Sequence, residues 1–138
     1  MMSLDTFVME HNVEKSICPP DIELFEAVKG KIGVEIGVQL KDYLLQYGYL
    51  AYESVELYGV NTRQGLESDL VKQTMYLHHY FPCANPFIAI ENRGEGIYSL
   101  VDGRDEVYFF IPENNGEIQD TGMQLYEYIL KRFEATLE

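Results

Sequence analysis

The second half of the chain is divided into short apolar runs by closely spaced turns. Turn-forming residues recur at 92–95, 102–105 and 113–116, and the last turn contains the pair Asn115-Gly116, which tolerates positive φ. Connections this short join antiparallel neighbours, because a parallel pair needs a crossover of roughly a dozen residues or more. We therefore expect an antiparallel meander with strands at 87–91, 96–101, 106–112 and 117–120.

The segment 36–60 has the pattern of one helix followed directly by one strand. Its apolar residues at 38, 40, 44, 45 and 47 recur at helical spacing, and Gly48 supplies the left-handed backbone that ends helices. From Ser54 to Tyr58, polar and apolar residues alternate with a period of two, as in a half-buried strand. We expect Tyr47, Tyr49, Tyr52 and Tyr58 either to fill the core or to stand at its rim.

Helical periodicity also occurs near both ends of the chain. Ser3 and Asp21 are suitable N-caps for helices at 3–11 and 21–30, the second ending at a glycine. Thr121 is expected to cap a closing helix that runs to about residue 137. The segment 66–80 fits either a helix or an irregular crossover.

The length of 138 residues suits one cooperative core and is short for two ordinary domains, which usually hold roughly 100 to 150 residues each. The expected fold is therefore a single α+β domain over residues 1–138, with the meander flanked by N-terminal helices and a C-terminal helix. Cys18 and Cys83 belong to no paired motif and are expected to be free thiols in a reducing cytoplasm. We find neither a signal peptide nor a membrane-spanning stretch, so we expect a soluble, cytoplasmic protein.

The formal net charge of −13 restricts the partners that the protein can bind. The region 91–120 is the most acidic, with eight acidic and two basic residues. A field of this sign repels nucleic acids and anionic lipids, and it attracts basic partners. We therefore expect no nucleic-acid or membrane binding, although solubility alone would also explain such a charge.

Residues that could carry catalysis or bind a metal lack the spacing that these functions need. The neighbours His78 and His79 point in different directions on a helix or a strand, and no serine lies in a Gly-x-Ser-x-Gly motif. The sequence 93–96 has two glycines but no lysine and no following helix, so it forms a turn rather than a phosphate cradle. We expect no enzyme, no catalytic residue, no cofactor and no metal. A small-ligand or metal site on the acidic hairpin turns remains an alternative.

Several short motifs between residues 22 and 133 occur in a characteristic order. They are an aromatic-Leu pair inside a helix, a glycine that ends it, a glycine-rich turn between strands, and an aspartate after that turn: Tyr43-Leu44, Gly48, Gly94 with Gly96, and Asp102. This order resembles the SUKH superfamily, the Smi/Knr-like group. The family's usual Leu-Pro pair before the first core helix is replaced by Ile36-Gly37.

This resemblance implies a function, because many bacterial members of the superfamily are immunity proteins. It implies a cytoplasmic antitoxin that binds and blocks a secreted toxin, often a nuclease, whereas eukaryotic relatives imply a regulatory scaffold in cell-wall signalling. Because the chain is acidic, we expect a basic toxin, bound by a monomer or a weak homodimer. The candidate partner-binding residues are seven acids and one tyrosine: Glu53, Glu56, Tyr58, Glu91, Glu95, Asp102, Asp105 and Glu106.

Overall fold

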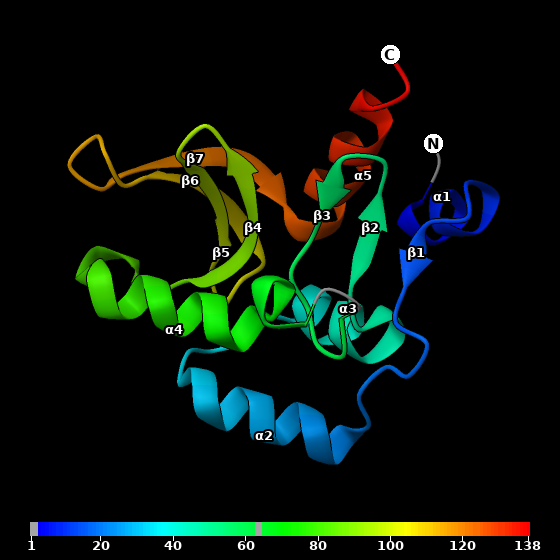
Figure 1. Cartoon of the computed structure of the whole chain (residues 1–138), viewed down its shortest axis with the longest axis horizontal. Helices are drawn as coiled ribbons and strands as arrows, with labels where there is room; N and C mark the ends of the chain where they lie inside the picture. Colours follow the sequence, from blue (N-terminus) through cyan, green and yellow to red (C-terminus); the bar gives the residue numbers. More distant parts are fainter. Residues whose placement is uncertain (1–2, 63–64) are drawn as a thin grey trace.

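The computed structural model (Figure 1) contains two antiparallel sheets with helices around them, and it describes residues 3–62 and 65–138, with side chains at 3–62 and 67–138. The smaller sheet has the order β1-β2-β3, and the larger has the order β4-β5-β6-β7. The strands are β1 (Glu14–Lys15), β2 (Leu50–Tyr52), β3 (Val55–Glu56), β4 (Ile88–Gly94), β5 (Ile97–Val101), β6 (Glu106–Ile111) and β7 (Glu117–Gln124). The helices are α1 (Leu4–Glu10), α2 (Ile22–Ile32), α3 (Val38–Tyr47), α4 (Leu70–Tyr80) and α5 (Leu125–Ala135), with short 3-10 helices η1 (Gly65–Ser68) and η2 (Pro82–Ala84). The fold is α+β, as expected.

The four-stranded meander is confirmed, and its last strand is longer than expected. Thr121 does not cap a helix, because β7 continues to Gln124 and the Thr121 hydroxyl donates a hydrogen bond to the Val107 carbonyl, at 2.7 Å. The helix α5 begins only at Leu125. The pairing of β7 with β6 extends to Glu106 and Gln124. It therefore keeps Thr121 in a strand, although Thr121 is a suitable residue to start a helix.

The expected helix starts at Ser3 and Asp21 are confirmed. The Asp21 carboxylate accepts a hydrogen bond from the Leu24 amide at 2.8 Å, and Ser3 Oγ accepts one from the Thr6 amide. The second helix passes through residue 30 and ends at Gly33, which has the positive φ of a C-cap. Of the two alternatives for 66–80, the helix is the correct one, since α4 spans Leu70–Tyr80 and has Asp69 as its N-cap.

The segment after Gly48 forms a hairpin of two short strands rather than the one strand expected. Glu53 turns the chain with φ of 53°, so that β2 and β3 pair with each other. The Leu57 amide then donates to the Leu50 carbonyl at 3.0 Å, and the Tyr58 amide donates to the Ile90 carbonyl at 2.6 Å. The residues after β3 thus join the two sheets along one seam.

The larger sheet is covered on both faces. Neighbouring residues on β6 show this, because the Phe110 ring lies 5.3 Å from the Phe81 ring just after α4, whereas the Phe109 ring lies 6.2 Å from the Tyr128 ring on α5. The helix α1 packs beside α5, where the rings of Phe7 and Phe133 stack at 5.8 Å. Figure 1 shows α4 and α5 on different sides of this sheet, with α2 beyond α3 and α4.

Candidate functional site

A polar cleft of about 540 Å³ lies at the seam between the two sheets. Its walls come from β3 with the flanking Ser54 and Tyr58, from η1, from the start of α4, and from the end of β4. We call it the seam cleft. The side chains that define its chemistry are Glu56, Tyr58, Glu67, Gln73, Asn92 and Arg93.

The seam cleft presents negative charge. Glu56 and Glu67 are both exposed, so their carboxylates are available to a partner. Arg93 also lines the cleft, but its guanidinium carbon lies 4.6 Å from the ring centroid of Phe109, which is not part of the lining. This cation-π contact holds the positive charge toward the α5 side of the sheet. The remaining side chains of the cleft supply hydroxyl and amide groups.

A clamp built around Gly59 brings η1 and α4 to the cleft. The Gly59 amide donates to the Ser68 carbonyl at 3.0 Å, and the Leu70 amide donates to the Gly59 carbonyl at 2.8 Å. Sequence reasoning missed Glu67 and Gln73 for this reason, since they reach the cleft through backbone bonds that no local pattern indicates. The glycine at position 59 is the one signal in the sequence that marks a close backbone approach.

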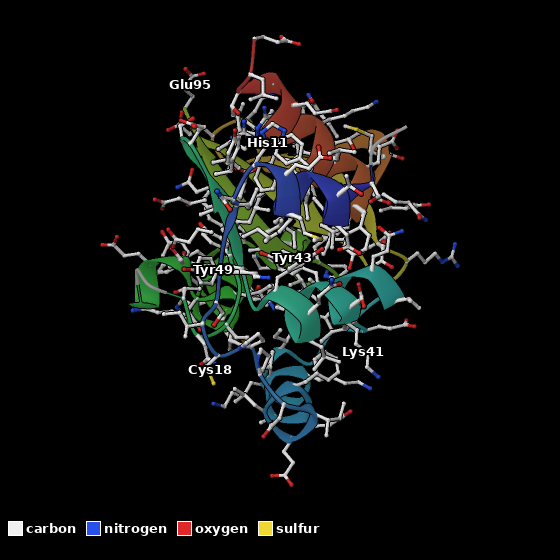
Figure 2. All side chains as sticks on the ribbon, turned by 90° about the vertical axis from the view of Figure 1, so that its right-hand side faces the viewer. His11, Cys18, Lys41, Tyr43, Tyr49 and Glu95 are labelled. Atoms are coloured by element: carbon white, nitrogen blue, oxygen red, sulfur yellow. The ribbon has the colours of Figure 1, made fainter. Side chains whose placement is uncertain are left out.

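The structure separates the eight candidate residues: four lie at or beside the seam cleft, three lie at the turn 102–105 and its edge, and Glu91 lies in the middle of β4. Glu56 and Tyr58 line the seam cleft, and Glu53 and Glu95 lie in hairpin turns next to the lining residues Ser54 and Gly94. Figure 2 shows Glu95 at the outer end of the sheet, whereas Tyr43 points into the interior. The turn 102–105 connects the other ends of the antiparallel strands β5 and β6. The structure therefore does not bring all eight residues together.

Glu91, one of the candidate partner-binding residues, is buried. Its side chain is 1% exposed and accepts two hydrogen bonds from Arg132, at 3.0 and 3.1 Å. The Tyr128 hydroxyl also donates to Glu91, and it contacts Ser99 Oγ at 2.5 Å. Glu91 points toward α5 and forms an internal ion pair, which leaves its carboxylate no surface to offer a partner.

Asp105 is also buried, because it caps α3 from a distant turn. Its carboxylate oxygens accept hydrogen bonds from the amides of Gln39 at 2.9 Å and Leu40 at 3.0 Å. The residue at the N-cap position of α3 is Gly37, which has no side chain to make this bond. An added Cβ at Gly37 would lie 2.4 Å from Oδ1 of Asp105, so the missing side chain makes room for the remote cap.

Asp102 and Glu106 stabilise the same turn. Asp102 Oδ1 accepts hydrogen bonds from the amides of Arg104 at 2.8 Å and Glu106 at 3.0 Å. The Tyr108 hydroxyl lies 3.1 Å from both Asp102 Oδ2 and Glu106 Oε2. Much of the hydrogen-bonding capacity of these carboxylates is therefore directed at their own turn, and partner binding at this end stays a prediction.

Replacing Asp105 with alanine is expected to lower the free energy of unfolding by about 2 kcal/mol, because two helix-end amides lose a charged acceptor. Urea unfolding of the variant measures this change. Glu113→Ala, an exposed acid in the β6–β7 turn, is the matched control and should change stability by less than about 0.5 kcal/mol. Equal effects of the two substitutions would show that Asp105 does not cap α3.

The tyrosines of the helix-strand junction mostly fill the core. Tyr47, Tyr49 and Tyr58 are between 2% and 6% exposed, and Tyr52 is half-buried. The Tyr43 hydroxyl donates to the Tyr58 carbonyl at 2.8 Å and accepts from the Leu50 amide. Burial raises the pKa of Tyr43 and of Tyr58 well above the ordinary value of 10.0.

These raised pKa values predict alkaline unfolding. The unfolded chain loses its tyrosine protons near pH 10.0, whereas Tyr43 and Tyr58 in the folded chain keep theirs to higher pH. The free energy of unfolding therefore has its full value below about pH 10 and falls as the pH rises through the folded-state pKa values. We expect Tyr43 and Tyr58 to lose their protons only together with the circular dichroism signal of the fold. Titration of all 11 tyrosines in one step with the fold intact would contradict this account.

Two further properties of the described residues bear on function. Among residues 3–62 and 67–138, no three His, Cys, Asp or Glu side chains are grouped as a metal site requires. In the part of the chain that the structure describes, none of the helices has the length and apolar character needed to cross a membrane.

The fold is that of an α+β protein with a polar cleft at the seam of two antiparallel sheets. A family model described as SMI1-KNR4 cell-wall (SUKH_5) matches residues 5–134 of the chain. The chain therefore belongs to the SUKH superfamily and to its SMI1-KNR4 family, which confirms the resemblance seen in the sequence. A comparison with curated proteins finds no match.

Proposed function

We propose that this protein is a cytoplasmic, non-enzymatic immunity protein, a monomer or weak homodimer, that binds a basic toxin and covers its active or substrate-binding site. The observation that carries the proposal is the seam cleft, in which two exposed carboxylates, Glu56 and Glu67, remain while the Arg93 charge is held over Phe109. Membership of the SUKH superfamily supports a binding role. A basic nuclease would be attracted by the negative net charge of this protein.

The charge distribution supports fast, salt-sensitive association. A protein of net charge −13 attracts a basic partner at long range, which raises the association rate at low ionic strength. Of the candidate residues near the cleft, the exposed Glu53, Glu56 and Glu95 then supply the contact surface, and the buried Tyr58 lies at the floor of the cleft. The buried Glu91 and Asp105 act only by holding β4 and α3 in place.

The experiment uses the product of the neighbouring gene, which the proposal expects to be a large, toxin-bearing protein. The toxin domain is expressed in cells together with the wild-type protein or the Glu56→Lys/Glu67→Lys variant, and growth and co-purification are measured. The wild type should protect and co-purify, and the variant should do neither. The matched control Glu26→Lys/Glu134→Lys makes the same charge change on α2 and α5, outside the cleft, and should still protect. Full protection by the cleft variant would refute the proposed site.

A second candidate function is a regulatory scaffold that binds host proteins of wall synthesis or signalling. The description of the matched family, SMI1-KNR4 cell-wall, favours this alternative. Neighbouring genes and a deletion strain separate the two functions. A scaffold predicts altered sensitivity to wall-damaging agents and no toxin binding, whereas an immunity protein predicts toxin sensitivity with an unchanged wall.

A further inference from the structure

The exposed face of α4 continues the seam cleft with aromatic side chains. Gln73 lines the cleft, and Tyr76 and Tyr80 follow it at spacings of three and four, which places all three on one face of the helix. Tyr76 is 48% exposed and Tyr80 is 61% exposed, although both are large aromatic residues. Their ring centroids lie 4.9 Å apart, so the two rings form one patch.

Tyr98 on β5 links this patch to the cleft. It is half-buried and pairs across the sheet with Asn92, which lines the cleft, and with Phe110, whose ring contacts Phe81 just after α4. Because directly paired residues share one face of a sheet, Tyr98 lies on the α4 side of the sheet beside the cleft. We call Tyr58, Tyr98, Tyr76 and Tyr80 the tyrosine row.

The chemistry of this surface selects for cations. A tyrosine ring has a negative face that attracts a cation, and exposed tyrosines are common at the centres of protein interfaces. At the cleft end of the row, Glu56 and Glu67 add two carboxylates. A guanidinium group matches both features, because it stacks on rings and forms two parallel hydrogen bonds with a carboxylate, whereas an ammonium group is a strongly hydrated point charge.

We propose that the seam cleft and the tyrosine row are one surface that binds an arginine-bearing segment of the partner protein. One arginine of this segment pairs with the cleft carboxylates, and another lies over the rings of Tyr76 and Tyr80. The inference rests on the proposed function, since it names the chemistry of the partner that the same cleft receives. It adds the outer face of α4 to the binding surface.

The test needs no toxin. The full-length, isotope-labelled protein is titrated with an Arg-Gly-Arg peptide capped at both ends, and with the matched Lys-Gly-Lys peptide, while amide chemical shifts are recorded. Shifts should concentrate in the segments 54–58, 67–80 and 92–98, and the arginine peptide should bind more tightly. Shifts spread evenly over the acidic surface, or equal binding of both peptides, would overturn the inference.

Variants of the exposed tyrosines show whether peptide binding needs an aromatic ring or only an apolar side chain at these positions. Tyr76→Leu/Tyr80→Leu should weaken the arginine peptide about fivefold, as expected for losing exposed cation-π contacts, while Tyr76→Phe/Tyr80→Phe should bind within about twofold of the wild type. Both variants should fold, because these side chains are exposed. Equal binding by the leucine variant and the wild type would overturn the inference.

The outcomes also separate this inference from the proposed function. If the leucine variant still neutralises the toxin and binds it as tightly as the wild type, the tyrosine row does not bind the partner, and the proposal for the cleft stands. If the peptide maps to the surface as expected while the neighbouring toxin is not bound, the inference stands and the immunity function is refuted.

Discussion

Replacing Arg132 with alanine is expected to lower the free energy of unfolding by about 3 to 5 kcal/mol, because it leaves a buried carboxylate without its cation. Glu91 is 1% exposed and Arg132 donates two hydrogen bonds to it. The pair ties the middle of β4 to α5, and β4 carries Asn92 and Arg93 to the seam cleft. Urea unfolding measures the loss.

The adjacent residue provides the matched control for this experiment. Lys131 forms an ion pair with Glu127 at 3.4 Å on the same helix, but both side chains are more than half exposed. Lys131→Ala should therefore change the unfolding free energy by less than about 1 kcal/mol. A double variant, Glu91→Gln/Arg132→Met, should recover much of the stability because it removes both charges. If Arg132→Ala and Lys131→Ala have equal effects, the buried pair has no special role.

Replacing Gly59 with alanine is expected to destabilise the protein by about 3 kcal/mol, since the new methyl group has no space. Its Cβ would lie 1.9 Å from the Gly48 carbonyl oxygen and 2.6 Å from Cβ of Tyr49. The backbone must then move apart at the point where it clamps η1 and α4 beside the cleft. We expect urea unfolding to show the loss, and toxin binding to weaken with it.

Gly30 is the control for the second experiment. It lies inside α2, and a Cβ added there would meet nothing within 4 Å. Gly30→Ala should therefore stabilise the protein by up to about 1 kcal/mol, because alanine favours the helix more than glycine does. A Gly59→Ala variant as stable as the wild type would contradict the close approach of the two chain segments.

The fold was largely predictable because its signals are local. The turns at 102–105 and 113–116 and the caps at Ser3 and Asp21 mark boundaries that the structure keeps. The errors arose where pairing partners distant in sequence decide the outcome. Thr121 is in a strand because the pairing of β6 with β7 continues beyond it.

The site was only partly predictable, for a related reason. An acid in a sequence gives no indication of whether it faces water or another element, and Glu91 and Asp105 proved to be partners of α5 and α3. Alternation along the strand placed Glu56 on the exposed side, where it lines the seam cleft, and its role in partner binding stays a prediction. Glu67 was missed because its segment reaches the cleft only through the clamp at Gly59.

The affinity of the cleft for the proposed basic toxin is the measurement that tests the account most directly. The dissociation constant is determined for the wild type, for Glu56→Gln/Glu67→Gln and for the equally charged control Glu26→Gln/Glu134→Gln, at low and at physiological ionic strength. We predict a loss of at least about tenfold for the cleft variant at both ionic strengths, and a change of less than about twofold for the control at physiological ionic strength. Equal affinities of the two variants would contradict the account, because the toxin would then respond to total charge and not to the seam cleft.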